Sequence, residues 1–424
     1  MKIAVIGAGV SGLVAAYKLG QQHEVTLFEA GNYPGGHTNT VDVEVEGQQL
    51  AVDTGFIVFN ERTYPNFCAL IEELGIGWNE TSMSFGATCP RSGFEYGTES
   101  LGSWLARPAN LWDSRLYVLI RDIFRFFRIA KRQLASAPDE LARQTLAEFL
   151  DQHRFSDTFR QFYIVPMTAA VWSAPPSTAL QFPALTLLQF LSNHGLLSAT
   201  EAPVWRTIRG GSREYVRAIL QRFSGQLRLN TPIASVKRGP DGVQVTPEGG
   251  AAEHFDQVLL ACHSDQALAM LADPSDAERE VLGGIAYQPN EAILHTDRQQ
   301  LPRSRKAWAS WNYRLSDDPE QPATLSYHMN RLQHLPVETP ISVTLNAGEQ
   351  IDPATILRRI DYAHPVYTQA TIASQNRWAD ISGPQFKTWY AGAYWFYGFH
   401  EDGVRSALRA VATMGEGEAV AAAA

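Results

Sequence analysis

Three glycines and one glutamate near the start of the chain have the types and spacing needed to bind a dinucleotide. The segment Gly7-Ala8-Gly9-Val10-Ser11-Gly12 fits the pattern G-x-G-x-x-G, and Glu29 follows 17 residues after its last glycine. In this pattern the first glycine permits a tight turn, the second lets the backbone approach a pyrophosphate, and the third allows close helix–strand packing. The acid accepts hydrogen bonds from ribose hydroxyls and repels a 2′-phosphate, so we expect NADP to be disfavoured.

These residues need a strand, a turn and a helix to position them, and the flanking sequence predicts all three. Residues 1–6 read as a near-continuous apolar strand of the kind buried in a parallel sheet, 13–19 as a helix, and 24–28 as a second strand that ends at the glutamate. The helix N-terminus, with Ser11 beside it, would present N–H donors and the positive end of its dipole to phosphate. A chance glycine-rich turn would seldom keep this context.

A second motif, Gly35-Gly36-His37-Thr38, follows the glutamate. It resembles the loop that lies along the FAD diphosphate in the superfamily of flavin-containing amine oxidases, phytoene desaturases and protoporphyrinogen oxidases. His37 stands where that superfamily usually has an arginine, so the resemblance implies a weaker, pH-dependent contact at this position. The resemblance implies FAD as the cofactor, and residues 52–56 are similar to the strand that next meets the flavin.

Later segments extend the resemblance over nearly the whole chain. It implies that Val236 gives backbone hydrogen bonds to adenine, although an ordinary sheet residue is the alternative, and that Ala261 ends a strand approaching the diphosphate. Near the C-terminus, Gly392 and the sequence His400-Glu401-Asp402 match the place that closes the flavin site. A helix N-terminus there would stabilise negative charge on the reduced flavin. Glu401 and Asp402 could instead be the ordinary acidic first turn of any helix.

The substrate is less specified than the cofactor. Residues 364–367, 308–313 and 398–403 are similar to a narrower bacterial group catalogued as predicted NAD/FAD-binding proteins and often encoded near cyclopropane-fatty-acid synthases. Our leading hypothesis is therefore an FAD-dependent dehydrogenase, desaturase or isomerase that acts on an apolar, lipid-like or isoprenoid substrate by hydride transfer to flavin N5. The alternatives are a flavin amine oxidase that produces hydrogen peroxide and a flavin-bound, non-catalytic lipid-handling protein.

The catalytic residues stay open in the sequence, because flavin oxidoreductases need little acid–base chemistry from the protein. Some superfamily members use a lysine that holds a water near N5, for which Lys306 and Lys387 are candidates, with a surface role as the alternative. By strand-end position alone, four further residues are expected to line the cavity: Asn312, Tyr313, His328 and Tyr397. The eleven histidines lack metal-ligand spacing, so no metal is expected.

The predicted fold class is α/β, with a Rossmann-like FAD-binding domain assembled from discontinuous segments and an α+β substrate domain. The FAD-binding domain would comprise residues 1–75, 204–265 and 385–424. Residues 76–203, mostly helical, and 266–384 would form the substrate domain. In the latter we expect an antiparallel sheet over the flavin, with strands at 292–296, 307–313, 324–329 and 342–346.

Residues 111–134 predict a basic amphipathic helix that carries a local charge of +4. Its arginines recur at helical spacing and form one stripe: Arg121, Arg125, Arg128 and Arg132. Apolar residues occupy the other side: Leu116, Leu119, Ile120, Ile123, Phe127 and Ala130. Such a helix can lie on an anionic membrane surface, whereas a solvated basic face packed on its own core is the alternative.

The composition excludes several classes of protein. The 424 residues are 45% hydrophobic and 19% charged, which is typical of a globular chain, and a net charge of −9 argues against a nucleic-acid binder. Cys68, Cys89 and Cys262 are widely spaced and fit a reducing cytoplasm better than disulfides. No apolar run is long enough to span a membrane. We therefore expect a cytoplasmic protein, with the inner membrane face as a possible surface and the oligomeric state open.

Overall fold

A five-stranded parallel sheet is built from segments that lie far apart in the sequence. The computed structural model describes residues 1–172, 179–198, 203–315 and 324–421. The sheet has the strand order β19-β13-β1-β2-β9, and every neighbouring pair is parallel. Its strands are β1 (Lys2–Ile6), β2 (Glu24–Phe28), β9 (Gln226–Arg228), β13 (Gln257–Leu260) and β19 (Thr388–Tyr390). Because β1 is central, its residues from Ile3 onward are buried and uniformly apolar.

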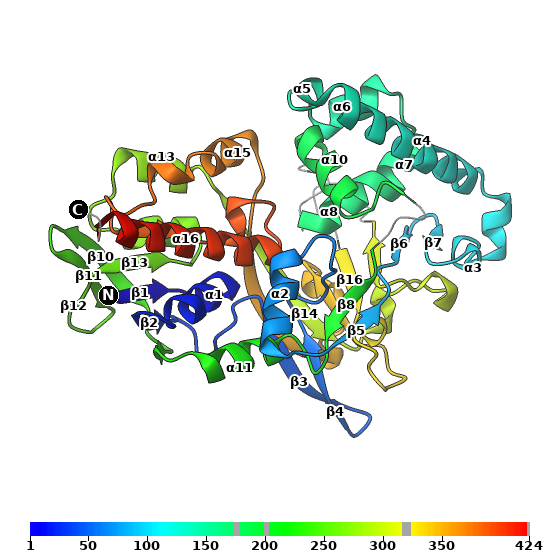
Figure 1. Ribbon diagram of the computed structural model, residues 1–424. Coiled ribbons are helices and arrows are strands. Elements are labelled where there is room, and N and C mark those ends of the chain that lie inside the picture. The colour runs from blue at the N-terminus through cyan, green and yellow to red at the C-terminus, as the bar shows by residue number, and fades with distance from the viewer. Residues whose placement is uncertain (173–178, 199–202, 316–323, 422–424) are drawn as a thin grey trace.

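Four helices pack around this sheet and bring the two ends of the described chain together. Helix α1 (Val10–Leu19) lies against α16 (His400–Ala421) and α11 (Arg213–Arg222), while α2 (Pro65–Leu74) contacts both α11 and α16 (Figure 1). Helix α16 begins at His400. The reason is local: the Asp402 carboxylate accepts hydrogen bonds from the backbone N–H groups of Phe399 (2.9 Å) and Tyr397 (3.2 Å).

A seven-stranded sheet of order β18-β14-β17-β16-β15-β6-β7 forms the second layer. Its strands are β6 (Phe85–Thr88), β7 (Glu95–Gly97), β14 (Tyr287–His295), β15 (Trp311–Arg314), β16 (Thr324–His328), β17 (Ser342–Leu345) and β18 (Ile356–Pro365). The pairing is antiparallel, as predicted, except that β15 and β6 run parallel. The expected strand 307–313 starts only at Trp311, because residues 305–307 form a 3-10 turn. The long strand β18 was not predicted, since its residues are mostly half-buried and lack an apolar alternation.

A group of helices stands apart at the upper right of Figure 1. They are α4 (Ser114–Ser136), α5 (Pro138–Leu141), α6 (Leu146–Gln152), α7 (Asp157–Phe159), α8 (Val165–Trp172) and α10 (Ala184–Asn193), whereas α3 (Leu101–Trp104) lies below them beside β7. Helix α4 starts three residues after the expected position because the Asp113 carboxylate accepts the backbone N–H of Arg115 (3.0 Å) and caps it. None of the helices that the structure describes is long and apolar enough to cross a membrane.

The remaining elements are short hairpins, one small sheet and connecting helices. They are β3 (Thr40–Val45) with β4 (Gln48–Asp53), β5 (Trp78–Thr81) with β8 (Trp205–Ile208), the sheet of β10 (Ile233–Gly239), β11 (Gly242–Pro247) and β12 (Glu253–Phe255), and α12 (Ser264–Met270), α13 (Asp276–Gly283), α14 (Met329–Leu332) and α15 (Gln369–Gln375). The fold is thus α/β with a parallel nucleotide-binding sheet and a second, mainly antiparallel sheet. The domain boundaries at residues 76, 204, 266 and 385 stay a prediction.

Candidate active site

A cavity of about 820 Å³ opens at the carboxyl ends of the parallel strands. The ends of β1, β2 and β13 reach it through Gly7, Glu29 and Ala261, and the turn after β19 reaches it through Gly392. Ligands bind at this edge of a parallel sheet because the loops that follow neighbouring strands meet there. The structure therefore brings together residues from the two ends of the chain, as the sequence predicts.

The three glycines of the first turn are required for different reasons. A Cβ on Gly12 would lie 1.8 Å from the carbonyl oxygen of Gly7, and one on Gly7, whose φ is +101°, would lie 2.7 Å from the carbonyl oxygen of Ala261. A Cβ on Gly9 would meet no protein atom within 4 Å. Gly9 lines the cavity and is the N-cap of α1, where no side chain caps the helix. Contacts within the protein therefore explain why Gly7 and Gly12 must be glycine, but they do not explain Gly9. At Gly9 the missing side chain leaves room for a ligand to approach the backbone.

Glu29 is fixed at the end of β2 by two backbone hydrogen bonds. Its carboxylate accepts the N–H of Ala8 (2.7 Å) with one oxygen and the N–H of Gly31 (2.8 Å) with the other. Glu29 lines the cavity, and the backbone N–H of Thr231 donates to its carbonyl (2.9 Å). This geometry holds the acid where ribose hydroxyls can donate to it.

The Gly-Gly loop lies against the first turn. Gly35 and Gly36 both have positive φ, and the N–H of Gly35 donates to the carbonyl of Ala8 (2.7 Å). The His37 ring stacks on Tyr362 at 4.5 Å, and its Nε2 is buried without a partner among the described residues. Burial, and after it the neighbouring His364, lowers the pKa of His37 well below its ordinary value. His37 therefore offers a neutral imidazole to the cavity rather than the expected pH-dependent charge.

A buried hydrogen-bond chain connects this loop to the start of α16. The Thr38 hydroxyl lies 2.5 Å from the Tyr215 hydroxyl, which lies 2.8 Å from His400 Nε2. The His400 ring also stacks on Phe56 at 3.6 Å and lines the cavity. Burial lowers the pKa of His400 to about 3, so the ring is neutral. Thr38 thus acts on the site through Tyr215, a residue that sequence reasoning missed because it lies 177 positions from Thr38.

Glu401 and Asp402 do not line the cavity, which corrects their expected cofactor contacts. The Glu401 carboxylate caps a different helix, α2, by accepting the backbone N–H groups of Asn66 (3.1 Å) and Phe67 (2.9 Å). Asp402 caps its own helix, and burial raises its pKa to about 7. The alternative interpretation of these acids as helix-capping charges is the one the geometry supports.

Val236 also lies away from the cavity. Its side chain is fully buried, and its carbonyl accepts the N–H of Ala272 (2.9 Å). Ile233, three positions earlier at the start of β10, lines the cavity beside Pro232. A register irregularity between Ile233 and Ser235 separates the two positions. Ser11 does line the cavity, although its hydroxyl donates to the carbonyl of Gly403 (2.9 Å).

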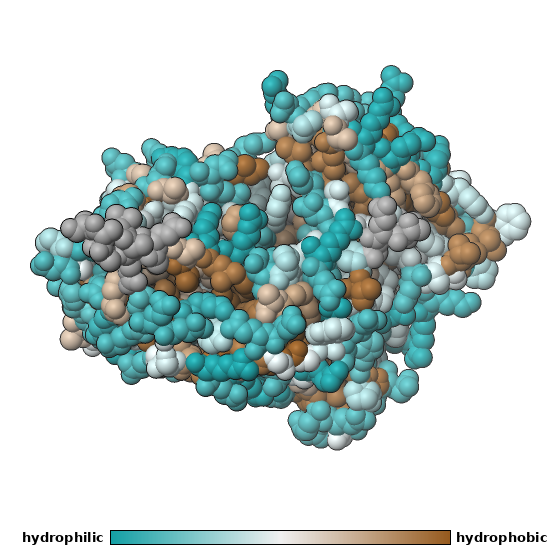
Figure 2. Space-filling model, in the orientation of Figure 1, coloured by the Kyte–Doolittle hydropathy of each residue, from teal (hydrophilic) through white to brown (hydrophobic). Residues whose placement is uncertain are grey.

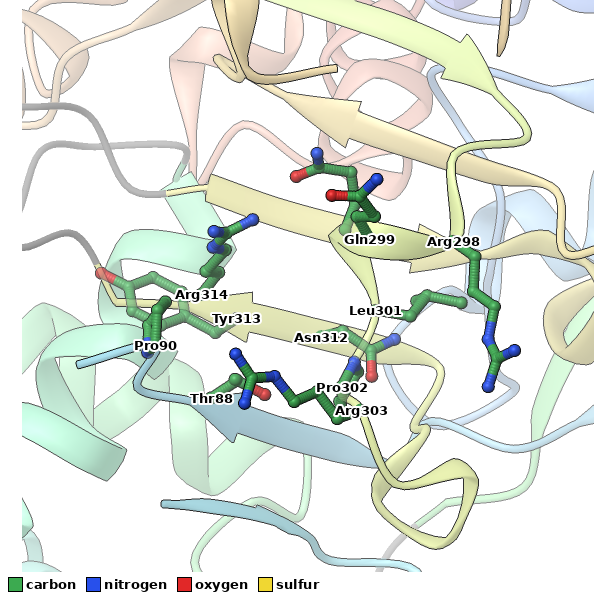
Figure 3. Close-up of a pocket in the computed structure, with 11 residues that line it drawn as sticks. Thr88, Pro90, Arg298, Gln299, Leu301, Pro302, Arg303, Asn312, Tyr313 and Arg314 are labelled. Carbon is green, nitrogen blue, oxygen red and sulfur yellow. The ribbon is translucent and has the colours of Figure 1, made fainter. Parts of the chain in front are cut away.

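The candidate catalytic residues lie elsewhere. Lys306 is exposed, and the ammonium of Lys387 donates to the carbonyls of Gly239 and Pro240. Asn312 and Tyr313 line a separate cavity, shown in Figure 3, and Tyr397 lines a third. His328 lines neither of the first two and packs its ring against Trp308. Among the described residues that line the main cavity there is no lysine or arginine.

The end of the cavity remote from the glycine turn is apolar. Its walls come from two helices and the turn after the second one: Met167 and Val171 from α8, Phe190 from α10, and Leu196 from the turn after α10. Four strands complete them: Phe85 from β6, Trp205 from β8, Trp311 from β15 and Tyr327 from β16. The carboxylates among the described lining residues are those of Glu29 and Glu248. Both lie at the nucleotide end, since the N–H of Glu248 donates to Pro232, next to Thr231. No charged group therefore faces the apolar end within the described part of the chain.

These residues fit FAD. The uncapped N-terminus of α1, the open side of Gly9 and the unpartnered His37 Nε2 would hold the pyrophosphate, and the Glu29 carboxylate would accept hydrogen bonds from the ribose. Among the described residues, no cluster of three or more His, Cys, Asp or Glu side chains could hold a metal ion. The fold and the cavity define a dinucleotide-binding protein with a large apolar site.

The family follows from the sequence profile described as flavin containing amine oxidoreductase, which matches residues 10–414. The chain belongs to this family. It is an FAD-dependent oxidoreductase.

Individual relatives differ in what they act on. A protein assigned as a flavin-containing monoamine oxidase, AofH of Mycobacterium tuberculosis, is 26% identical over 280 residues, which span 64% of this chain and 59% of the relative. A 4,4′-diapophytoene desaturase of Staphylococcus aureus is 62% identical over 40 residues, or 9% of this chain and 8% of the desaturase. The chain thus matches about three fifths of the length of the monoamine oxidase relative.

Solved structures show the same fold at low identity. A fatty acid isomerase from P. acnes that produces CLA aligns over 97% of both chains, with a TM-score of 0.70 and 16% identity. Cyclohexylamine oxidase from Brevibacterium oxydans aligns over 98% of both chains, with a TM-score of 0.67 and 16% identity. At this identity the likeness establishes the fold alone.

Proposed function

We propose that the protein oxidises, desaturates or isomerises a largely apolar substrate such as an acyl chain or an isoprenoid. The observation that carries this proposal is the uncharged, aromatic end of the main cavity, formed by α8, α10 and the strands of the second sheet. An apolar chain gains about 25 cal/mol for each Å² it buries there, whereas a charged substrate would lose its hydration without a partner.

Bound FAD would supply a hydride acceptor at N5, which needs little acid or base from the protein. The chain's own residues orient the reactants and exclude water. Phe190 and Phe399 stack at 4.8 Å and line the cavity, and the neutral His400 is held by Tyr215 and Phe56. Burial lowers the pKa of His194, which also lines the cavity, to about 4. The site therefore positions a C–H bond with neutral rings rather than with ionic groups.

Anaerobic mixing tests this function. The purified protein is expected to be yellow. If it oxidises or desaturates its substrate, a fatty acid or an isoprenoid should bleach the visible flavin band. If it isomerises its substrate, the band should stay and an isomer of the added lipid should be recovered. The variant Leu196→Asp places a charge at the half-buried apolar wall and should abolish the reaction while keeping the flavin. Val204→Asp, at an exposed position outside the cavity lining, is the matched control. Bleaching by amines alone would refute an apolar substrate.

Amine oxidation is the second candidate, favoured by the family and by the aromatic rings that line the cavity. It predicts hydrogen peroxide on aerobic incubation with a primary amine. If neither amines nor lipids change the flavin spectrum or are themselves changed, the result favours a flavin-bound, non-catalytic lipid-handling protein.

We further propose that helix α4 and the segment before it contact an anionic membrane. Apolar side chains gather at the right-hand end of the molecule, over α3 and α4 (Figure 2), where Leu101 is 83% exposed and Trp112 is 90% exposed. On α4 itself, Tyr117 and Phe124 alternate with Arg121 on the exposed face. Basic and aromatic groups on one helical face are typical of a helix that lies in the headgroup region.

The expected arginine stripe needs one revision. Arg125 is half-buried, lies over the Phe155 ring at 4.6 Å and donates to the carbonyl of Arg154 (3.3 Å). Arg128 and Arg132 are exposed and carry the basic face further along the helix. The opposite face of α4 packs in the same hydrophobic cluster as Met167 and Phe190, so the proposed membrane face and the apolar wall belong to one packed unit. Since cytoplasmic leaflets carry anionic lipid, the inner membrane face is the surface that we propose for this contact.

Co-sedimentation with phosphatidylglycerol vesicles tests the contact. Binding should fall with added salt and should be lost in Tyr117→Ser/Phe124→Ser and weakened in Arg128→Gln/Arg132→Gln. Val204→Ser, an exposed apolar position on another segment, is the control. Unchanged sedimentation of both double variants would refute the membrane surface.

A further inference from the structure

Strand β15 separates two cavities. Trp311 lines the main cavity, whereas the rest of the strand, Asn312, Tyr313 and Arg314, borders a different space. A second cavity of about 420 Å³ lies there, between β15 and the segment 298–303 (Figure 3). It shares no lining residue with the main cavity, and nothing in the proposed reaction uses it.

The second cavity is positively charged in a protein whose net charge is −9. Arg298, Arg303 and Arg314 line it, and no aspartate or glutamate is among its described lining residues. Within the described part of the chain, neither Arg303 nor Arg314 forms an ion pair or a side-chain hydrogen bond. In Figure 3 Arg303 reaches toward Thr88, Arg314 lies at the same end of the cavity but points away from Thr88, and Arg298 lies at the other end beyond Leu301. The register of β15 with β6 pairs Arg314 with Thr88 directly.

Two buried polar atoms at this cavity lack partners among the described residues. Gln300 is 3% exposed; its Nε2 donates to Asp297 Oδ2 (3.2 Å) and to the carbonyl of Gln350 (2.8 Å), but its Oε1 accepts nothing. The hydroxyl oxygen of Thr88 is also buried and unpartnered. Buried polar atoms are normally satisfied, so these two point to a ligand that completes their hydrogen bonds.

The walls of the cavity are fixed without a ligand. The buried Glu95 carboxylate accepts the backbone N–H groups of Arg303 (3.0 Å) and Ser304 (2.9 Å), which holds the segment that carries Arg303. The Asn312 side chain is bonded to the backbone of Ala309 through both its oxygen (2.9 Å) and its nitrogen (2.6 Å). A preformed site loses little conformational entropy on binding.

We propose that this second cavity binds a small organic anion, with a phosphate or carboxylate group between Arg303 and Arg314. Guanidinium groups suit both anions because they donate paired hydrogen bonds to two oxygens. The Thr88 hydroxyl donates to the same group, and a hydroxyl or amine of the ligand donates to Gln300 Oε1. Pro90, Leu301 and Pro302 contact its carbon framework. The cavity is large enough for a small metabolite, but at about half the volume of the main cavity it is too small for a dinucleotide.

Calorimetric titration of the FAD-loaded protein tests this site. The probes are glycerol 3-phosphate and citrate, which distinguish phosphate from carboxylate, together with inorganic phosphate. At least one organic probe is expected to bind more tightly than inorganic phosphate. Arg303→Gln/Arg314→Gln should raise the dissociation constant at least tenfold and leave the flavin spectrum unchanged, since both side chains lack partners within the described chain.

Arg143→Gln/Arg279→Gln removes the same charge from two exposed positions elsewhere and should bind like the parent protein. If the first double variant loses its flavin, Arg314→Gln alone replaces it. Equal affinity in the parent and the cavity variant, no binding of either organic probe at millimolar concentration, or an equal loss in the control variant would overturn the proposal.

Discussion

A single added methyl group at Gly9, in the glycine turn after β1, should weaken FAD binding without preventing the protein from folding. Gly9→Ala adds a Cβ that meets no protein atom within 4 Å, and the backbone at Gly9, with φ −69° and ψ −179°, accepts an L side chain. The smaller entropy of the unfolded chain favours the variant, while alanine is a poorer N-cap, so the free energy of unfolding of the apoprotein should change by less than about 1 kcal/mol. In the FAD complex the methyl group would compete with the pyrophosphate for space beside the turn.

Overfilling a packed contact costs about 1–3 kcal/mol. Because each 1.4 kcal/mol changes an equilibrium tenfold, the dissociation constant for FAD should rise by roughly 5- to 150-fold. The assay is titration of the apoprotein with FAD, followed by flavin fluorescence, beside thermal unfolding of the apoprotein. Gly12→Ala is the contrasting variant: its Cβ would lie 1.8 Å from a backbone oxygen, so it should fail to fold. Parent-like FAD affinity in Gly9→Ala would show that the pyrophosphate does not lie at this turn.

Two further predictions concern buried polar groups. Tyr215→Phe removes the hydroxyl that bonds both Thr38 and His400. We expect this variant to lose about 1–3 kcal/mol in the free energy of unfolding and to have a shifted flavin spectrum. The control is Tyr17→Phe: the Tyr17 hydroxyl bonds Glu73 away from the cavity, so this variant should leave the flavin spectrum unchanged. His295 is fully buried and burial lowers its pKa to about 4, so the unfolded state binds a proton first as the pH falls below about 6.5. Urea unfolding should therefore show a loss of about 2 kcal/mol from this residue between pH 7.5 and 5, which His295→Gln should remove; identical pH dependence in both proteins would contradict it.

The sequence predicts the nucleotide end of the site well because its determinants are local. Gly7, Gly9 and Glu29 act through a strand, a turn and a helix that are contiguous in the chain, and the structure places them as expected. Val236 differs because its carbonyl already accepts the N–H of Ala272, and Ile233, three positions earlier, is the residue of β10 that lines the cavity.

The apolar end of the site was harder to predict because it depends on strand faces and long-range contacts. Asn312 and Tyr313 directly follow Trp311, yet Trp311 lines the main cavity and the other two line the second one, so position at a strand end does not by itself assign a residue to a cavity. Glu401 caps a helix that lies 334 residues earlier in the chain, and Tyr215 joins two segments that the sequence keeps apart. Polar residues of this kind acquire their partners only when the sheet is assembled.

The position of β19 in the parallel sheet has a consequence for the order of events during synthesis. The strand at residues 388–390 pairs with β13, which itself pairs with the first strand of the chain, and Gly392 and His400 then close the cavity wall. A nascent chain that has exposed the glycine turn, Glu29 and even β13 still lacks this wall. Flavin captured by such a chain would be held by one side only and would dissociate. Stable loading of FAD must therefore wait until residue 400 has left the ribosome, so a truncation that removes this segment should yield a colourless protein even though the whole dinucleotide fingerprint is present.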